Sequence, residues 1–286
     1  MKRALVLAGG GVAGIAWELG VLRGIQDVDP DLGSSLAAAD VIVGTSAGSA
    51  VAAQITSGTA LEDLYAAQLA ETSSEIEVDF DMDSLIARFT SAAAGATTAE
   101  EMRRRIGALA LATPTVEESV RRGAIAARLP VPTWPDRVVL LPAVEAASGE
   151  LMVFTRESGV ALVDAVAASC AVPGIWPPVT IDGHRYIDGG VRSATNADLA
   201  AGCDRVLVIT PTSADTPPPW GDLGHEIELL QPADVQVVYA DPASLAAFGT
   251  NPLSPATRGP SARAGREIGR ARAADVARFW RRADEG

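Results

Sequence analysis

The sequence predicts an α/β fold of three layers, in which helices cover both faces of a mainly parallel central sheet. Segments of strand character alternate with segments of helical spacing along most of the 286 residues, and this alternation is typical of parallel sheets. A short apolar strand at 3–8 precedes a helix at 14–26, and a strand at 40–43 precedes a helix at 47–57. Further β-like runs cover 137–143, 151–155, 179–181, 185–187, 205–210 and 235–239.

Two regions depart from this alternation. Asp182-Gly183 separates two β-like runs and is a strong hairpin signal. Residues 61–129 contain no convincing strand and are expected to form a helical insertion after the helix at 47–57. We therefore expect one domain over 1–254, followed by a helix over 255–286 that packs on the domain or trails it.

Composition and charge exclude several classes of protein. The net charge of −13 argues against nucleic acid as a partner, because binding to a phosphate backbone needs a basic surface. No apolar run approaches the roughly 20 residues of a membrane span, and the first residues lack the features of a signal peptide, so we expect a cytoplasmic protein. Cys170 and Cys203 have neither metal-ligand spacing nor a disulfide pattern and are expected to be buried.

The C-terminal region is basic although the chain is acidic. Residues 255–282 hold eight arginines against Glu267 and Asp275, hence a net charge of +6. A basic helix that follows an acidic body can dock on that body or stay solvated, and it can also contact lipid headgroups. The sequence leaves these uses open.

The glycine-rich stretch GGGVAG at 9–14 admits two uses. Gly9, Gly11 and Gly14 match the G-x-G-x-x-G pattern of dinucleotide-binding folds, which also need an acidic residue at the end of the second strand. Here the second strand runs directly into GTSAG at 44–48, and no carboxylate ends it. The glycines are better explained as backbone donors to an oxyanion, because amides without a neighbouring Cβ can approach a reacting group closely.

GTSAG between a strand and a helix is the signature of a nucleophile turn. Its serine, Ser46, stands on a sharp turn that needs small neighbours, which Gly44 and Gly48 provide. The hydroxyl then lies at the start of the next helix, where free N–H groups favour developing negative charge, and the N–H of Ala47 is placed to donate to an oxyanion. The alternative is a helix start at which Ser46 only caps the helix.

A serine hydroxyl needs a base, and three side chains are candidates. His184 lies beside the hairpin turn and His225 follows a proline-rich segment, and each is more simply explained as a surface histidine. Asp188 ends a strand and precedes Gly189 and Gly190, so its carboxylate can approach another loop. Asp-Gly-Gly alone is also typical of an ordinary turn.

Four motifs taken together resemble the patatin-like phospholipases. They are GGGVAG after the first strand, GTSAG after the second, ASCAVPG at 168–174 and DGGVRSATNADLA at 188–200, in the family's order over about residues 1–210. The resemblance implies a patatin-like catalytic domain at 1–254 that hydrolyses lipid carboxylic esters through an acyl-enzyme, without metal or cofactor. It also implies a lipid or ester substrate and a transient contact with a lipid or membrane surface.

In that family a Ser–Asp dyad replaces the usual triad. The resemblance therefore implies that Ser46 is the nucleophile, that Asp188 is its general base, and that Asn196 supports the aspartate loop. The implied oxyanion hole consists of backbone amides, those of Gly10, Gly11, Val12 and Ala47. The glycines that the motifs require are Gly9, Gly14, Gly44, Gly48, Gly189 and Gly190.

One position departs from the family's pattern. The glycine loop of the family usually carries Lys or Arg where this chain has Ala13. A positive charge near the oxyanion is therefore missing, unless Arg192 or another arginine supplies it. The backbone donors do not depend on this charge.

Two other functions stay open. A serine esterase of the α/β-hydrolase type would use Ser46, Asp188 and His225 in the chain order of that fold. This triad is less well supported, because the glycine-rich loop follows the very first strand and His225 lies in no recognisable motif. A catalytically silent binding module would keep only the fold, and the intact Ser46 and Asp188 argue against it.

Overall fold

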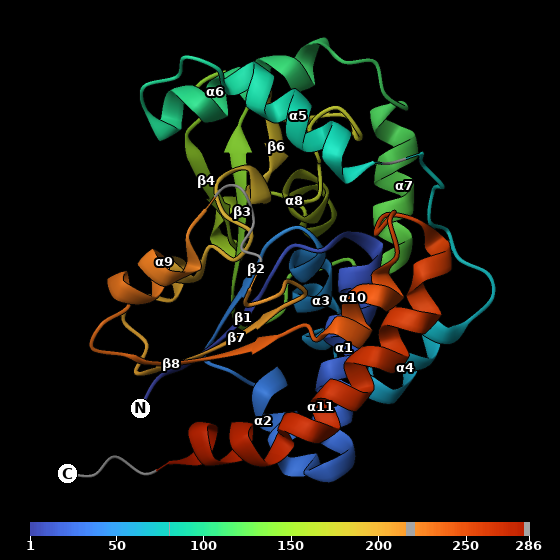
Figure 1. The fold of residues 1–286 in the computed structure, drawn as a ribbon, viewed down its shortest axis with the longest axis vertical. Coiled ribbons are helices and arrows are strands. Elements are labelled where there is room, and N and C mark those ends of the chain that lie inside the picture. Colours follow the sequence, from blue (N-terminus) through green and yellow to red (C-terminus); the bar gives the residue numbers. More distant parts are fainter. Residues whose placement is uncertain (80, 216–220, 283–286) are drawn as a thin grey trace.

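The structure, a computed structural model, describes residues 1–79, 81–215 and 221–282 (Figure 1). Its centre is an eight-stranded sheet in the order β5-β6-β3-β2-β1-β7-β8, with β4 also paired to β3. The strands are β1 (Arg3–Leu7), β2 (Val41–Gly44), β3 (Val138–Glu145), β4 (Leu151–Phe154), β5 (Val179–Ile181), β6 (His184–Asp188), β7 (Arg205–Thr210) and β8 (Asp234–Tyr239). Strands β3, β2, β1, β7 and β8 run parallel, whereas β4, β5 and β6 pair antiparallel.

Helices cover both faces of this sheet. They are α1 (Gly11–Val28), α2 (Pro30–Ala37), α3 (Ala47–Ile55), α4 (Leu61–Leu69), α5 (Met82–Ala93), α6 (Ala99–Ala112), α7 (Glu118–Arg128), α8 (Leu162–Ser169), α9 (Leu223–Leu229), α10 (Pro242–Phe248) and α11 (Arg258–Arg281). In the part of the chain that the structure describes, no helix is both long enough and apolar enough to cross a membrane.

Alternate residues of the central strands enter two separate cores. In β1, Leu5 and Leu7 pack toward the layer that contains α1, α3 and α8. Ala4 and Val6 pack toward the opposite layer, formed by the short helix at 197–200 and by α9. Because both faces are covered, these strands are apolar throughout. The predicted three-layer fold with a mainly parallel sheet is confirmed.

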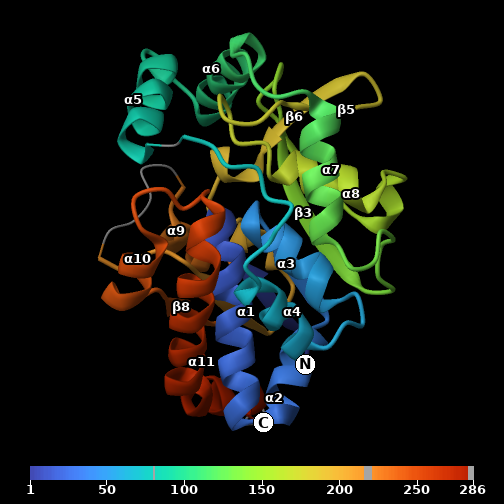
Figure 2. The ribbon, with the colours of Figure 1, turned by 90° about the vertical axis from the view of Figure 1, so that its right-hand side faces the viewer.

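The helices α4 to α7 form the insertion between α3 and β3, as the sequence predicts. Helices α5 and α6 pack beside β3 and β6, through Leu85, Phe89 and Ile106 against Val144 and Ile187. Helix α7 stands apart from this pair, next to α8 (Figure 2). Arg121 and Arg128 of this helix line a small cavity together with Ser46 and Ala47, at the turn before α3.

Helices α1 and α11 lie side by side and run in the same direction (Figure 2). Glycines on both helices let the backbones touch. A Cβ added at Gly265 would lie within 3.0 Å of the Trp17 carbonyl oxygen, and one added at Gly24 would clash in the same way with Arg266. Two backbones this close leave no room for even a methyl group.

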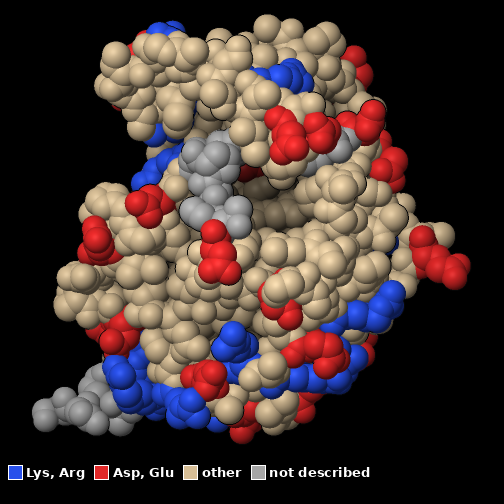
Figure 3. All heavy atoms as spheres, viewed as in Figure 1, with Lys and Arg blue, Asp and Glu red and all other residues tan. Residues whose placement is uncertain are grey.

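Ion pairs also join α11 to the acidic body. The Asp27 carboxylate accepts hydrogen bonds from Arg266 at 2.7 Å and from Arg270 at 2.8 Å, and these bonds lower the pKa of Asp27. Figure 3 shows Lys and Arg side chains gathered over the part of the surface where α11 runs. The same view shows Asp and Glu side chains around a hollow farther up. The domain boundary at residue 254 stays a prediction.

We expect the replacement Gly265→Ala to lower the free energy of unfolding by about 1–3 kcal/mol, because the added methyl group forces the two backbones apart. Gly123→Ala is the matched control. Gly123 lies in the middle of α7 with open space around its Cβ position, so alanine there should raise the free energy of unfolding by about 0.5–1 kcal/mol. Urea titration measures both. Equal stability of the Gly265→Ala and wild-type proteins would contradict the expectation.

Candidate active site

Ser46 stands on the turn between β2 and α3 in a strained backbone conformation. Its φ is 51° and its ψ −113°, a combination that residues other than glycine rarely adopt. A Cβ added at Gly44 would lie within 3.0 Å of the Gly48 carbonyl oxygen, and one added at Gly48 within 3.0 Å of the Leu7 carbonyl oxygen. Gly44 therefore lets the start of α3 lie against the end of β2, and Gly48 lets it pack directly against β1.

The Ser46 hydroxyl donates a hydrogen bond to Asp188, whose carboxylate lies at the end of β6. The distance from Oγ to Oδ2 is 2.7 Å, and the other carboxylate oxygen accepts the Gly190 N–H at 2.7 Å. Only 8% of Ser46 and 4% of Asp188 are exposed. Burial raises the pKa of Asp188 to about 7, although the hydrogen bonds from Ser46 and Gly190 oppose the shift. This carboxylate can thus exchange a proton near neutral pH.

Two residues that the sequence analysis gave no role hold the nucleophile turn. The Ser46 N–H donates to the Ser169 hydroxyl at 3.0 Å, and the Cys170 thiol donates to the Ser46 carbonyl at 3.1 Å. Both lie in ASCAVPG at 168–174, so the motif marks the right segment. Because the Ser46 N–H is committed to Ser169, it does not face a substrate.

Some backbone amides near Ser46 already donate a hydrogen bond within the protein, and others are uncommitted, that is, without an acceptor among the described residues. The Gly9 N–H donates to the Ala194 carbonyl at 2.7 Å, and the Ala13 N–H donates to the Pro252 carbonyl at 2.9 Å. Four amides have no acceptor among the described residues, those of Gly10, Gly11, Val12 and Ala47. Gly11, Val12 and Ala47 line the same small cavity as Ser46, whereas Gly10 does not.

Asn196 connects the nucleophile turn to the aspartate loop. Its side-chain N–H groups donate to the Thr45 hydroxyl at 3.0 Å, to the Ser193 carbonyl at 2.7 Å and to the Gly189 carbonyl at 3.3 Å. Thr45 precedes Ser46 and Gly189 follows Asp188. One buried amide therefore ties together the two turns that carry the hydroxyl and the carboxylate.

The structure does not bring either histidine to Ser46. The side chains of His184 and His225 are each 63% exposed, and their ion-pair partners are Glu145 and Glu228. The hydrogen bond of the Ser46 hydroxyl goes to Asp188. This geometry gives no support to the triad with His225.

Positive charge at the cavity comes from α7 and not from the glycine loop. Ala13 is buried, and Arg192 forms a bidentate pair with Asp198 at 2.6 and 2.9 Å. Arg192 is not among the residues that line the cavity, whereas Arg121 and Arg128 are. Two arginines of the helical insertion thus border the cavity that contains Ser46.

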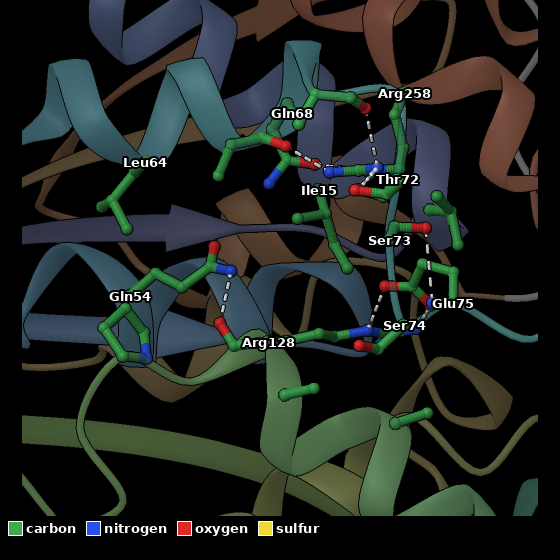
Figure 4. A pocket seen from close by; sticks show the side chains of 16 residues that line it. Ile15, Gln54, Leu64, Gln68, Thr72, Ser73, Ser74, Glu75, Arg128 and Arg258 are labelled. Atoms are coloured by element: carbon green, nitrogen blue, oxygen red, sulfur yellow. Dashed lines mark hydrogen bonds and ion pairs between the residues drawn. The ribbon is translucent and has the colours of Figure 1, made fainter.

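A larger cavity of about 330 Å³ lies next to the small one and shares Val12, Ile15 and Arg128 with it. Figure 4 shows Arg128 facing Glu75 in this cavity, and the two form a bidentate pair at 2.6 and 2.7 Å. Arg258 donates to Gln68 at 3.4 Å and to nearby backbone carbonyls. Apolar side chains, among them Ile15 and Leu64, line the remaining wall.

The family model for the patatin-like phospholipases matches residues 5–201, more than half of the chain. The chain belongs to the patatin-like phospholipase family. It is therefore a hydrolase that acts on acyl esters of lipids.

Solved structures with a similar fold include VipD from Legionella pneumophila, at 12% sequence identity and a TM-score of 0.45. The similarity covers 96% of this chain and 67% of VipD. The type III effector protein ExoU is similar at 17% identity and a TM-score of 0.43, over 96% of this chain and 53% of ExoU. The chain thus spans about half the length of ExoU. A search of the curated proteins gives no match.

We expect a protein with both His184→Ala and His225→Ala to keep ester hydrolysis within about tenfold of wild type, or roughly 1.4 kcal/mol in the barrier. Both imidazoles are exposed and lie away from the Ser46 hydroxyl, so neither is placed to take its proton. Steady-state hydrolysis of a short-chain ester measures the effect, with circular dichroism as the control for folding. A double variant that is folded but inactive would instead support a triad that includes a histidine.

Proposed function

We propose that this chain hydrolyses carboxylic esters of phospholipids or other lipids through an acyl-enzyme, with Ser46 as the nucleophile and Asp188 as its general base. The observation that carries the proposal is the 2.7 Å hydrogen bond from Ser46 Oγ to Asp188 Oδ2 in a buried site. A hydroxyl is a weak nucleophile unless a base within hydrogen-bond reach takes its proton.

The first half of the reaction forms the acyl-enzyme. Ser46 Oγ attacks the ester carbonyl carbon while Asp188 accepts the hydroxyl proton. The carbonyl oxygen becomes an oxyanion, and the uncommitted amides of Gly11, Val12 and Ala47 are positioned to donate to it. Asp188 then gives its proton to the departing alcohol.

The second half releases the acid. A water molecule takes the place of the alcohol, and Asp188 accepts its proton as the water attacks the acyl carbon. The second tetrahedral intermediate collapses with return of a proton to Ser46. The same carboxylate thus acts as base and then as acid in each half, which requires a pKa near neutrality, and the burial of Asp188 supplies this condition. Gly10 and Asn196 support the site by shaping the glycine loop and by tying the two turns together.

We expect fluorophosphonates to label Ser46 covalently and Ser46→Ala to abolish both labelling and turnover. Asp188→Asn should lose several orders of magnitude in kcat, because an amide cannot accept the Ser46 proton. Ser119→Ala is the matched control, since Ser119 is an exposed serine on α7, and it should leave labelling and turnover unchanged. Mass spectrometry of the labelled peptide identifies the site. Stoichiometric labelling of another serine would refute the proposed nucleophile.

We expect kcat/KM for a neutral ester to rise with pH and to level off above an apparent pKa of about 7. The sign follows from the chemistry, since Asp188 acts as base only in its ionised form and burial keeps it protonated at lower pH. At pH 6 the rate should be roughly tenfold below the plateau. A rate that is independent of pH between 5 and 8 would show that another group is the base.

A further inference from the structure

Arg121 is a buried cation whose hydrogen-bond donors are not all used by the described residues. It lies on α7 with 5% of its surface exposed, and its guanidinium carbon stands 3.7 Å from the centre of the Trp176 ring. Its Nε and Nη1 atoms are buried and have no hydrogen-bond partner among the described residues. Burial and the charge of Arg128 lower the pKa of Arg121 to about 9, so it still carries its charge at neutral pH.

The neighbouring arginines differ from Arg121 in this respect. Arg128 forms two short hydrogen bonds to Glu75, and Arg258 donates to Gln68 and to backbone carbonyls. Each of these two side chains is held by acceptors of the protein itself. Arg121 keeps donors that the described residues do not use. The carboxylates of Glu75 and Asp188 act on Arg121 through their charge, but they do not accept hydrogen bonds from its Nε and Nη1. Buried donors without an acceptor destabilise a protein, which favours a ligand as the missing acceptor.

The position of Arg121 limits what that ligand can be. Arg121 and Trp176 line the small cavity that also contains Ser46 and the amides of Val12 and Ala47. This cavity has a volume of about 10 Å³, room for about one water molecule. An ester that reaches Ser46 therefore widens it and comes to lie beside Arg121. The planar guanidinium fork pairs best with the paired oxygens of a carboxylate or phosphate, and the Trp176 ring fixes the plane of the fork.

We propose that Arg121, held by Trp176, forms an anion subsite beside Ser46 that binds a phosphate or carboxylate group carried by the ester substrate. The subsite makes the chain selective for anionic esters over neutral esters of the same acyl length. This selectivity rests on the proposed hydrolase function of Ser46. Because the interaction exists in the bound substrate and in the transition state alike, it acts on KM more than on kcat.

The test compares 1-decanoylglycerol with 1-decanoylglycerol 3-phosphate, which differ only in the phosphate. We expect wild type to prefer the phosphate by about tenfold or more in kcat/KM. Arg121→Met should remove this preference through a higher KM for the phosphate. Because the charge of Arg121 lowers the pKa of Asp188, both esters are compared on the high-pH plateau, where the neutral ester should lose much less in kcat/KM than the phosphate. Arg121→Lys keeps the charge without the fork and should restore part of the preference. Arg122→Met is the matched control, since Arg122 is exposed and paired with Asp164, and it should change neither substrate.

Binding of octyl phosphate to the wild-type protein, followed by calorimetry, tests the subsite without turnover. We expect Arg121→Met to weaken this binding by about tenfold or more, and inorganic phosphate to bind more weakly than octyl phosphate. Equal affinity for the two phosphates, without a preference among the esters, would assign the site to a free anion and overturn the proposal. An equal loss of kcat on both esters would also overturn it, because Arg121 would then act on the transition state.

Two controls distinguish a failure of this proposal from a failure of the proposed hydrolase mechanism and from a loss of folding. Absence of fluorophosphonate labelling at Ser46 would refute the proposed hydrolase mechanism, and the octyl phosphate measurement would still decide on the subsite. Arg121→Met should unfold at a temperature no lower than wild type, because it replaces an unpaired buried charge by an apolar side chain of similar length. Arg121→Lys provides the second variant if the methionine protein does not fold.

Discussion

The hydrogen bond between Ser46 and Asp188 depends on where β2 and β6 pair along β3. Strand β3 is long enough to pair with β2 near its start and with β6 near its end. Its residues Val138 to Leu140 pair parallel with β2, and its residues Ala143 to Glu145 pair antiparallel with β6. Strands β2 and β6 thus approach the middle of β3 from opposite ends, and both finish there. The turn after β2 carries the hydroxyl, and the last residue of β6 carries the carboxylate. Any slip of β3 by one residue would turn its side chains to the other face and would separate the two groups.

Burial explains why the site has its particular electrostatics. The same exclusion of water that raises the pKa of Asp188 leaves the guanidinium of Arg121 without solvent to solvate it. Both groups destabilise the folded chain, as does the strained backbone of Ser46. The two cores on either side of the sheet and the close contact of α1 with α11 supply the stability that offsets these terms. The chemistry of the site therefore depends on packing that lies far from it.

Sequence patterns predicted the parts of the molecule that are encoded locally. The parallel strands, the Asp182-Gly183 hairpin and the helical insertion follow from periodicity and turn residues. Helix α8 was not predicted, because Leu162–Ser169 is almost uniformly apolar apart from Asp164 and shows no clear helical period. Helix α1 begins at Gly11 instead of residue 14, since glycine allows the φ of 64° with which the helix starts directly after the glycine turn.

The assignments of Ser46 and Asp188 stay predictions, and the structure supplies their proximity. Arg121 gave no signal in the sequence, because α7 presents several arginines and only tertiary packing distinguishes the buried one from its exposed neighbour Arg122.

The polar groups of the site come from two parts of the fold, the sheet and the helical insertion. The hydroxyl, the carboxylate and the backbone donors all come from turns at the ends of strands, where the sheet fixes their relative positions; the hydroxyl and the carboxylate lie 2.7 Å apart. The cations come from α7, which packs on α8 and is tied to the strand β5 by hydrogen bonds from Thr180 to Glu118. In the family's pattern, a charged residue in the glycine loop stands one or two residues from the oxyanion donors, so its replacement would disturb them. With Ala13 in the loop and Arg121 on α7, charge and backbone donors are physically separate. Substitutions on α7 can therefore change which substrates bind while the geometry of Ser46 and Asp188 stays the same.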